Sequence, residues 1–181
     1  PYGAGSSVVG GVTSNVSSKY NGTISVNLSK FNKVLEVDDV SLSAKIQGGI
    51  RGPDLETSLK NYGLTLRHFP QSFEHSTLGG WIATRSGGHF ATLYTHIDDL
   101  VENISMISPN GKMNSLRVPG SGAGPSPDRF MLGSEGSMGI ITDAWVKLQK
   151  KPKFKATAGY LFSDFLSAAQ AVRSISQAGL Y

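Results

Sequence analysis

Short stretches with the alternating apolar and polar residues of half-buried β-strands recur along most of the chain. The expected strands are residues 23–28 (TISVNL), 34–38, 42–50, 64–66, 100–108, 113–118, 140–148 and 154–161. Asn110 and Gly111 follow the strand expected at 100–108, and this dipeptide predicts a tight hairpin between that strand and the next.

Three other stretches have helical signals. In residues 54–62, Leu55 and Leu59 are four positions apart, Pro53 suits the first turn and Gly63 suits the end. Two further helices are expected at residues 78–86, capped by Thr77 and ended by Gly87-Gly88, and at residues 163–178, with an apolar side. We expect the N-terminus of the helix at 78–86 to bind an anion.

The order of these elements indicates the fold class. The strands expected between residues 24 and 50 follow one another without intervening helices, which argues against a doubly wound parallel sheet. We therefore expect an α+β fold with mixed or antiparallel sheets flanked by helices.

Composition excludes several classes of protein. Of the 181 residues, 39% are hydrophobic and 17% charged, which is typical of a globular chain. The absence of cysteine excludes disulfides, iron–sulfur clusters and thiolate catalysis. The net charge is +4, and the lysines at 147–155 are better explained as a solvated strand edge than as a nucleic-acid site. No apolar stretch reaches the roughly 20 residues of a membrane span.

Three segments are rich in glycine, serine and threonine: residues 1–11 (PYGAGSSVVGG), 71–88 (QSFEHSTLGGWIATRSGG) and 128–139 (DRFMLGSEGSMG). Such segments expose backbone N–H groups, which bind phosphate. The first begins like the Rossmann fingerprint, but Val8 stands where the third glycine should be, and there is no Gly-Lys-Ser/Thr of a P-loop. A different dinucleotide site is indicated, with an ordinary surface turn as the alternative for one segment alone.

In order, the motifs PYGAGSS, PQSFEHSTLGGWIATRSGG and FMLGSEGSMGIIT resemble the FAD-binding (PCMH-type) domain of the vanillyl-alcohol-oxidase-type flavoprotein superfamily. The resemblance covers residues 1–148 and implies that residues 149–181 begin a cap or substrate domain. The superfamily's βαβ segment before the first motif does not occur here, so we expect a domain truncated at both ends that is inactive alone.

The middle motif is most similar to the alkyldihydroxyacetonephosphate (alkylglycerone-phosphate) synthase branch. The matching positions are Glu74, Ser76, Thr77, Gly79, Gly80, Trp81, Thr84, Arg85, Tyr94, Ile97, Asp99 and Leu100. Glycolate and D-lactate dehydrogenase relatives have Asn-Ala-Gly-Gly where this chain has RSGG at 85–88. Residues 89–93 (HFATL) differ from the Met-Lys-Lys-Asn sequence of eukaryotic synthases, which leaves the reaction open.

By this resemblance, the first motif holds the FAD diphosphate, residues 71–77 line the diphosphate and ribityl region, and residues 84–87 follow the isoalloxazine side. Glu135 is expected to accept an adenosine-side hydrogen bond, and Ile141 to contribute backbone contacts. The expected cofactor-binding residues are Pro1, Tyr2, Gly3, Ala4, Gly5, Ser6, Ser7, Gln71, Ser72, Phe73, Glu74, His75, Ser76, Thr77, Thr84, Arg85, Ser86, Gly87, Glu135, Gly136, Ser137, Met138, Gly139, Ile140 and Ile141.

Other residues of these segments have two interpretations. Arg85 either faces a phosphate or a reduced flavin, or forms a surface salt bridge with Glu74 or Asp98. Residues 85–89 (RSGGH) resemble the loop that attaches flavin covalently in some members, but there it is the first diphosphate loop, which lacks histidine here. We therefore expect non-covalent FAD. The histidines lack metal-ligand spacing, so no metal is expected, and Trp81 is expected in the core.

The resemblance implies an enzyme. In the synthase reaction, which belongs to ether lipid synthesis, a fatty alcohol replaces the acyl group of acyl-dihydroxyacetone phosphate through an adduct on flavin N5. The alternatives are an FAD-linked oxidoreductase acting on a 2-hydroxy acid or an alcohol, and a non-catalytic β-rich binding module. A small-molecule or lipid substrate is expected, with no nucleic acid; peripheral membrane contact and a homodimer are compatible. Catalytic residues are expected in the cap domain. The compartment is cytoplasmic if bacterial and peroxisomal if a eukaryotic synthase.

Overall fold

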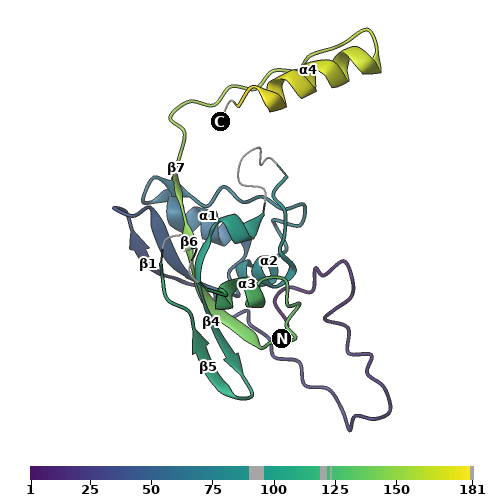
Figure 1. The fold of residues 1–181 in the computed structure, drawn as a ribbon, viewed down its shortest axis with the longest axis vertical. Coiled ribbons are helices and arrows are strands. Elements are labelled where there is room, and N and C mark those ends of the chain that lie inside the picture. The colour runs from purple at the N-terminus through teal and green to yellow at the C-terminus, as the bar shows by residue number, and fades with distance from the viewer. Residues whose placement is uncertain (90–95, 119–121, 123, 180–181) are drawn as a thin grey trace.

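The computed structural model describes residues 1–89, 96–118, 122 and 124–179, and its centre is a five-stranded sheet (Figure 1). The strands, in their order across the sheet, are β1 (Val34–Asp38), β2 (Ser43–Gln47), β6 (Ile140–Lys147), β4 (Val101–Ser108) and β5 (Gly111–Asn114). Each neighbouring pair is antiparallel, which confirms the expected α+β class.

Helices and a small second sheet complete the fold. The second sheet pairs β3 (Leu64–Thr65) with β7 (Gln149–Lys150). The helices are α1 (Gly52–Lys60), α2 (Leu78–Thr84), the 3-10 helix η1 (Ile97–Asp99), α3 (Pro127–Met131) and α4 (Phe165–Gln177). The bounds of the three expected helices are confirmed to within two residues. Helix α3 was not expected, because glycines and serines surround it.

The hydrophobic core fills the space between the sheet and helices α1 and α2. Helix α1 buries Leu55 and Leu59 completely, and α2 buries Trp81 and Ile82. From the sheet come Ala44, Ile46, Ile104, Ala144 and Val146, all at 0% exposure. This packing fixes α2 against the sheet and so positions the loops at both of its ends.

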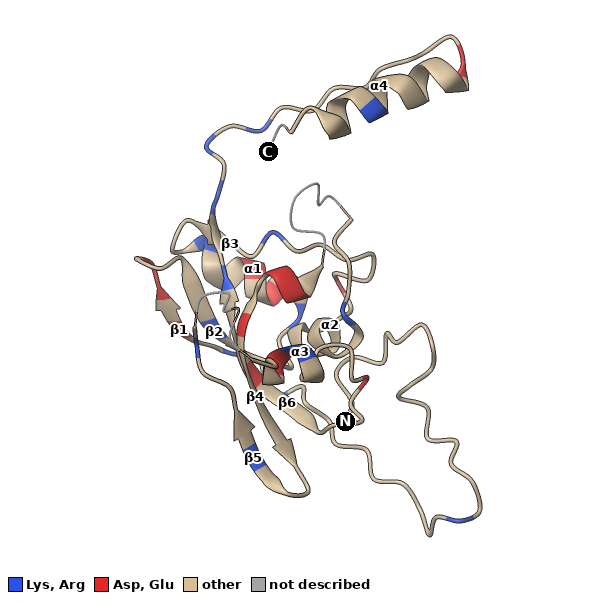
Figure 2. Ribbon diagram, in the orientation of Figure 1, with Lys and Arg blue, Asp and Glu red and all other residues tan. Residues whose placement is uncertain are grey.

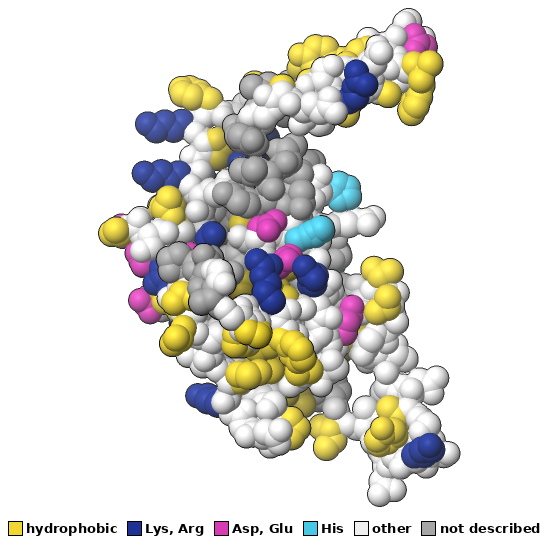
Figure 3. Space-filling view, in the orientation of Figure 1, with side chains coloured by type: hydrophobic (Ala, Val, Ile, Leu, Met, Phe, Trp, Pro, Cys, Tyr) yellow, Lys and Arg dark blue, Asp and Glu magenta, His cyan; other side chains and the backbone are white. Residues whose placement is uncertain are grey.

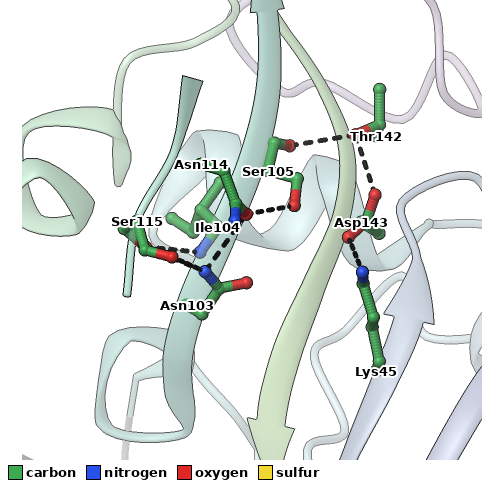
Figure 4. Close-up of polar contacts among 8 residues, drawn as sticks. All are labelled: Lys45, Asn103, Ile104, Ser105, Asn114, Ser115, Thr142 and Asp143. Carbon is green, nitrogen blue, oxygen red and sulfur yellow. Dashed lines mark hydrogen bonds and ion pairs between the residues drawn. The ribbon is translucent and has the colours of Figure 1, made fainter. Parts of the chain in front are cut away.

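A polar network ties the middle of the sheet to the chain that follows β5 (Figure 4). The amide of Asn103 donates to the backbone oxygen of Ser115, and the hydroxyl of Ser115 accepts from the backbone N–H of Ile104 at 3.0 Å. Lys45 of β2 pairs with Asp143 of β6 at 3.5 Å. The strand expected at 113–118 ends at Asn114. Beyond it, the Ser115 N–H still donates to the Ile104 oxygen at 3.1 Å, but the Ser115 hydroxyl, and not its backbone oxygen, accepts the Ile104 N–H.

The strand expected at residues 23–28 is wrong. The structure has there only an isolated parallel bridge between Tyr2 and Asn27, while Ile24 is 88% exposed. An alternating pattern does not make a strand without a partner, and the first 33 residues extend as a long loop (Figure 1). This loop is almost uncharged, since Lys19 is its only charged residue before Lys30 (Figure 2).

The C-terminal part departs from the sheet. The strand expected at 154–161 is also wrong: these residues form no regular element, and Phe154 is exposed. Asp164 caps α4 by accepting from Ser167 N–H at 2.8 Å, yet α4 has no buried residue. Figure 3 shows its hydrophobic side chains on the surface, away from the sheet. No helix in the described part of the chain is long and apolar enough to cross a membrane.

Candidate functional site

A cavity of about 400 Å³ lies where three distant segments of the chain meet. Its walls come from the glycine-rich N-terminal loop, from residues 72–86 in and around α2, and from the turn that precedes β6. These are the three glycine- and serine-rich segments of the sequence. The fold therefore brings together motifs that are separated by 59 and 39 residues in the sequence.

The N-terminal loop supplies free hydrogen-bond donors to this cavity. The backbone N–H groups of residues 3–9 have no acceptor within the described part of the chain. The loop is held at its start, where Tyr2 N–H donates to the Val26 oxygen at 2.8 Å, and at its end, where Gly11 N–H donates to the Ser7 hydroxyl at 3.3 Å. A row of free amides in a glycine loop suits the oxygens of a diphosphate.

The first and second motifs touch directly. A Cβ at Gly3 would lie 2.6 Å from Oγ1 of Thr77, so any larger residue there would displace the loop or Thr77. The same Thr77 oxygen caps α2 by accepting from Gly80 N–H at 3.3 Å. The N-cap of the helix, predicted from sequence, is confirmed and also forms part of the cavity wall.

The expectation that the N-terminus of α2 binds an anion is wrong. Its first amides already have acceptors in the protein: Leu78 N–H donates to the Ile50 oxygen at 3.1 Å and Gly79 N–H to the Gly48 oxygen at 2.7 Å. The next amide, that of Gly80, donates to Thr77. The helix is packed end-on against the sheet, so the free donors come from the N-terminal loop instead.

The third motif, residues 128–139, lies against the last turn of α2. Gly133 N–H donates to the Ile82 oxygen at 3.1 Å, and Glu135 N–H donates to the Ala83 oxygen at 2.8 Å. Glu135 has a φ of 53°, a left-handed conformation that turns the chain back toward the cavity. Its carboxylate is the only acidic side chain among the lining residues in the described part of the chain.

The wall behind α2 is a hydrogen-bonded aromatic cluster. The indole N–H of Trp81 donates to the Ser76 hydroxyl at 2.6 Å, and that hydroxyl donates to the Ser72 oxygen at 2.7 Å. Trp81 is 2% exposed, as expected of a core residue, and it also lines the cavity. The ring of Phe73 stacks on that of Trp81, with centroids 6.2 Å apart.

Of the two interpretations of Arg85, the structure supports the salt bridge with Asp98. Its guanidinium lies 2.7 Å from the Asp98 carboxylate, which Arg129 also contacts at 2.9 Å, and Arg85 does not line the cavity. Burial alone would raise the pKa of Asp98, but hydrogen bonds and the charges of Arg85 and Arg129 hold that pKa below its ordinary value. Arg85 is also in the left-handed conformation, so α2 ends there and not at the expected Gly87-Gly88.

The cavity gathers most of the expected cofactor-binding residues. Those that line it are Pro1, Gly3, Ala4, Gly5, Ser6, Ser7, Ser72, Ser76, Thr77, Thr84, Ser86, Glu135, Gly136, Gly139 and Ile141. Those that do not line it are Tyr2, Gln71, Phe73, Glu74, His75, Arg85, Gly87, Ser137, Met138 and Ile140. Tyr94, one of the positions that match the synthase branch, lies outside the described residues.

Sequence reasoning missed several lining residues: Val8, Val9, Gly11, Val12, Leu28, Gly79, Gly80, Trp81 and Ala83. The glycine pair at 10–11 was a signal that the first loop continues past Ser7. Leu28 gave no signal, because its place depends on the bridge between Tyr2 and Asn27. Among the described residues, no group of three or more His, Asp or Glu lies close enough to hold a metal ion.

Comparison with known proteins identifies the family. The FAD binding domain family matches residues 1–117. The chain belongs to this family. The alkyldihydroxyacetonephosphate synthase of Dictyostelium discoideum is 40% identical over 175 residues, which are 97% of this chain and 28% of that protein. A solved structure of an alkyldihydroxyacetonephosphate synthase has a TM-score of 0.86 at 40% identity, over 98% of this chain and 32% of that one.

Oxidoreductases are relatives as well. The glycolate oxidase subunit GlcD of Bacillus subtilis is 32% identical over 97% of this chain and 37% of its own length. The chain thus spans about three-tenths of the length of the synthases and somewhat more of GlcD. The resemblance inferred from the three motifs is confirmed. The free amides, hydroxyls and glycines of the cavity fit FAD, the cofactor of this FAD-binding domain.

Proposed function

We propose that this chain is the FAD-binding part of a flavoenzyme that catalyses the alkylglycerone-phosphate synthase reaction. In this reaction a fatty alcohol replaces the acyl group of acyl-dihydroxyacetone phosphate. The observation that supports the proposal most is the likeness to a synthase structure over 98% of the chain, at 40% identity. The motif from Glu74 to Arg85, which is similar to the synthase branch, adds to it.

The residues of the cavity have separate roles in this proposal. When bound, FAD would supply an isoalloxazine ring that acts as a temporary electron sink and ends the exchange unchanged. The amides of residues 3–9 bind the diphosphate, and Glu135 accepts a hydrogen bond on the adenosine side. Trp81, held by Ser76, keeps water away from one wall. Residues that select the substrate are proposed to lie in a cap domain.

Two finer points belong to the same proposal. We propose that FAD is held without a covalent bond, because no histidine or tyrosine side chain lines the cavity in the described part of the chain. Acid precipitation of the full-length protein should therefore release all of its flavin into the supernatant. We also propose that residues 1–148 form the FAD domain and that residues 149–181 begin the cap, which agrees with the exposure of α4.

The synthase reaction can be tested directly. The full-length protein is incubated anaerobically with acyl-dihydroxyacetone phosphate and a labelled fatty alcohol. We expect label in the ether product, one fatty acid released for each alcohol incorporated, and no net loss of flavin absorbance at 450 nm. A Gly3→Leu variant, which fills the cavity wall, should lose activity, whereas Gly122→Leu, at a site with no neighbour within 4 Å and outside the cavity lining, should retain it.

The second candidate is an FAD-linked oxidoreductase that oxidises a 2-hydroxy acid or an alcohol. The identity to GlcD over 97% of the chain favours it. In this case D-lactate or glycolate should bleach the flavin under anaerobic conditions, and no alcohol should be incorporated. That outcome would replace the synthase proposal and leave FAD binding intact. In both cases a small-molecule or lipid substrate is expected; a homodimer and peripheral membrane contact remain proposals.

A further inference from the structure

His68 is a buried side chain behind the cavity that no proposed role has used. It follows β3, is 1% exposed, and lies 2.8 Å from the Ser86 hydroxyl through its Nε2 atom. Its ring meets the ring of Trp81 edge-on, with centroids 5.3 Å apart. The imidazole is thus packed between one cavity residue and the hydroxyl of another.

The backbone of Ser86 is fixed on both sides. Its N–H donates to the Trp81 oxygen at 3.0 Å, and its own oxygen accepts from Ile97 N–H at 3.0 Å. Only the hydroxyl group remains free to rotate about χ1. Because Ser86 lines the cavity, the orientation of this hydroxyl decides which hydrogen-bonding group the wall presents.

His68 can set that orientation because it is a neutral imidazole at ordinary pH. Burial, with a smaller contribution from the charge of His96, lowers the pKa of His68 to about 4. A neutral imidazole has one donor and one acceptor nitrogen. Whichever role Nε2 takes toward Ser86, the hydroxyl retains hydrogen-bonding capacity for a second partner on the cavity side.

We propose that His68 is a positioning residue that holds the Ser86 hydroxyl in the cavity wall, so that Ser86 forms a hydrogen bond with bound FAD. The inference depends on FAD binding, which the family shows, and is independent of whether the reaction is the synthase exchange or an oxidation. His68 itself does not contact the cofactor, since it does not line the cavity.

The test is a double-mutant cycle on FAD affinity in the full-length protein, measured by quenching of flavin fluorescence. Ser86→Ala removes the hydroxyl, His68→Leu removes the ring nitrogen, and His68→Gln retains an amide near the place of Nε2. We expect Ser86→Ala and His68→Leu each to weaken binding by about fivefold to tenfold, the size of one hydrogen bond. The double variant should bind no more weakly than Ser86→Ala, and His68→Gln should recover most of the loss.

Other outcomes contradict the proposal. If Ser86→Ala leaves the FAD dissociation constant unchanged, Ser86 makes no bond to FAD. If the losses from His68→Leu and Ser86→Ala add in full, His68 does not act through Ser86. Ser58→Ala on α1, which removes a hydroxyl that donates to the Asp54 oxygen of its own helix and does not line the cavity, is the matched control and should bind FAD normally.

A second measurement does not depend on affinity and remains decisive if His68→Leu fails to fold. In wild-type apoprotein, ¹⁵N NMR of the histidine rings reports the tautomer of His68. Adding FAD should shift the Nε2 resonance of His68, because its partner Ser86 gains a new bond, and Ser86→Ala should abolish this shift. A His68 resonance that shifts equally in Ser86→Ala would overturn the proposal.

Discussion

The backbone N–H of Gly79 donates a 2.7 Å hydrogen bond to the backbone oxygen of Gly48, so the first turn of α2 rests on the end of β2. A Cβ at Gly79 would lie 2.9 Å from the same oxygen. The Gly48 oxygen belongs to packed backbone, which cannot move aside as the end of a long side chain can. This contact sets the height of α2 above the sheet and with it the positions of Thr77, Trp81 and Thr84 in the cavity wall.

Replacing Gly79 with alanine should therefore destabilise the protein, although alanine favours helix. We expect Gly79→Ala to lower the free energy of unfolding by about 1–3 kcal/mol, the usual cost of overpacking. Urea unfolding followed by circular dichroism measures this change. Gly159→Ala, where a Cβ has no neighbour within 4 Å, is the control. A Gly79→Ala variant as stable as this control would show that the contact is not tight.

Gly3→Ala should have the opposite profile, with a loss of FAD affinity and little change in stability. The added Cβ would meet Thr77 Oγ1 at 2.6 Å and displace the exposed loop, while the hydrophobic core is untouched. We expect FAD to bind about tenfold more weakly or worse, because several amide bonds to the diphosphate would be lost together. Titration calorimetry and thermal unfolding of the apoprotein distinguish this result from general misfolding.

Asp98→Asn should weaken the tie between α2, η1 and α3. The Asp98 side chain is 8% exposed and meets Arg85 and Arg129, which are both more than half exposed. Because water screens the arginines, we expect a loss of about 1–2 kcal/mol, below the cost of breaking a fully buried pair. Arg129→Gln should cost less, since Arg85 still pairs with Asp98. Denaturant midpoints of the two variants decide this order.

The burial of His68 makes stability depend on pH in a defined window. The pKa of His68 is about 4 in the folded protein, against the ordinary 6.5. Between these two pH values the unfolded chain binds a proton that the folded chain does not. The stability that the neutral His68 contributes is therefore fully present above pH 6.5 and is lost as the pH falls toward 4. The largest loss is about 3 kcal/mol. Urea unfolding from pH 7.5 to 4.5 should give a clearly flatter profile for His68→Gln than for the wild type.

The fold was predictable where pattern and partner agree. Helices α1 and α2 follow from the spacing of Leu55 and Leu59 and from the Thr77 cap, and the β4–β5 hairpin follows from Asn110-Gly111. The strands expected at 23–28 and 154–161 failed because alternation alone does not supply a neighbouring strand. A strand depends on long-range pairing, whereas a capped helix depends mainly on its own residues.

The site was predictable as a set of motifs, but its contacts were not. Glycine and serine content located all three walls, since close backbone approach requires glycine wherever it occurs. It could not show that the amides of α2 are used by Gly48 and Ile50, nor that Arg85 turns away to Asp98. Those outcomes depend on the depth at which α2 packs. For the same reason His68, an isolated histidine without metal spacing, gave no sequence signal of its contact with Ser86.

The glycine-rich N-terminal loop offers backbone N–H groups to a diphosphate. The cavity has no lysine or arginine side chain among its described lining residues, so its attraction for a diphosphate comes from short-range amide dipoles. Dissolved ions screen long-range attraction between charges strongly and such close contacts weakly. Retention of the cofactor by this FAD-binding domain should thus be nearly independent of ionic strength, and high-salt buffers can strip nucleic acids and loosely bound proteins from the domain without removing its flavin.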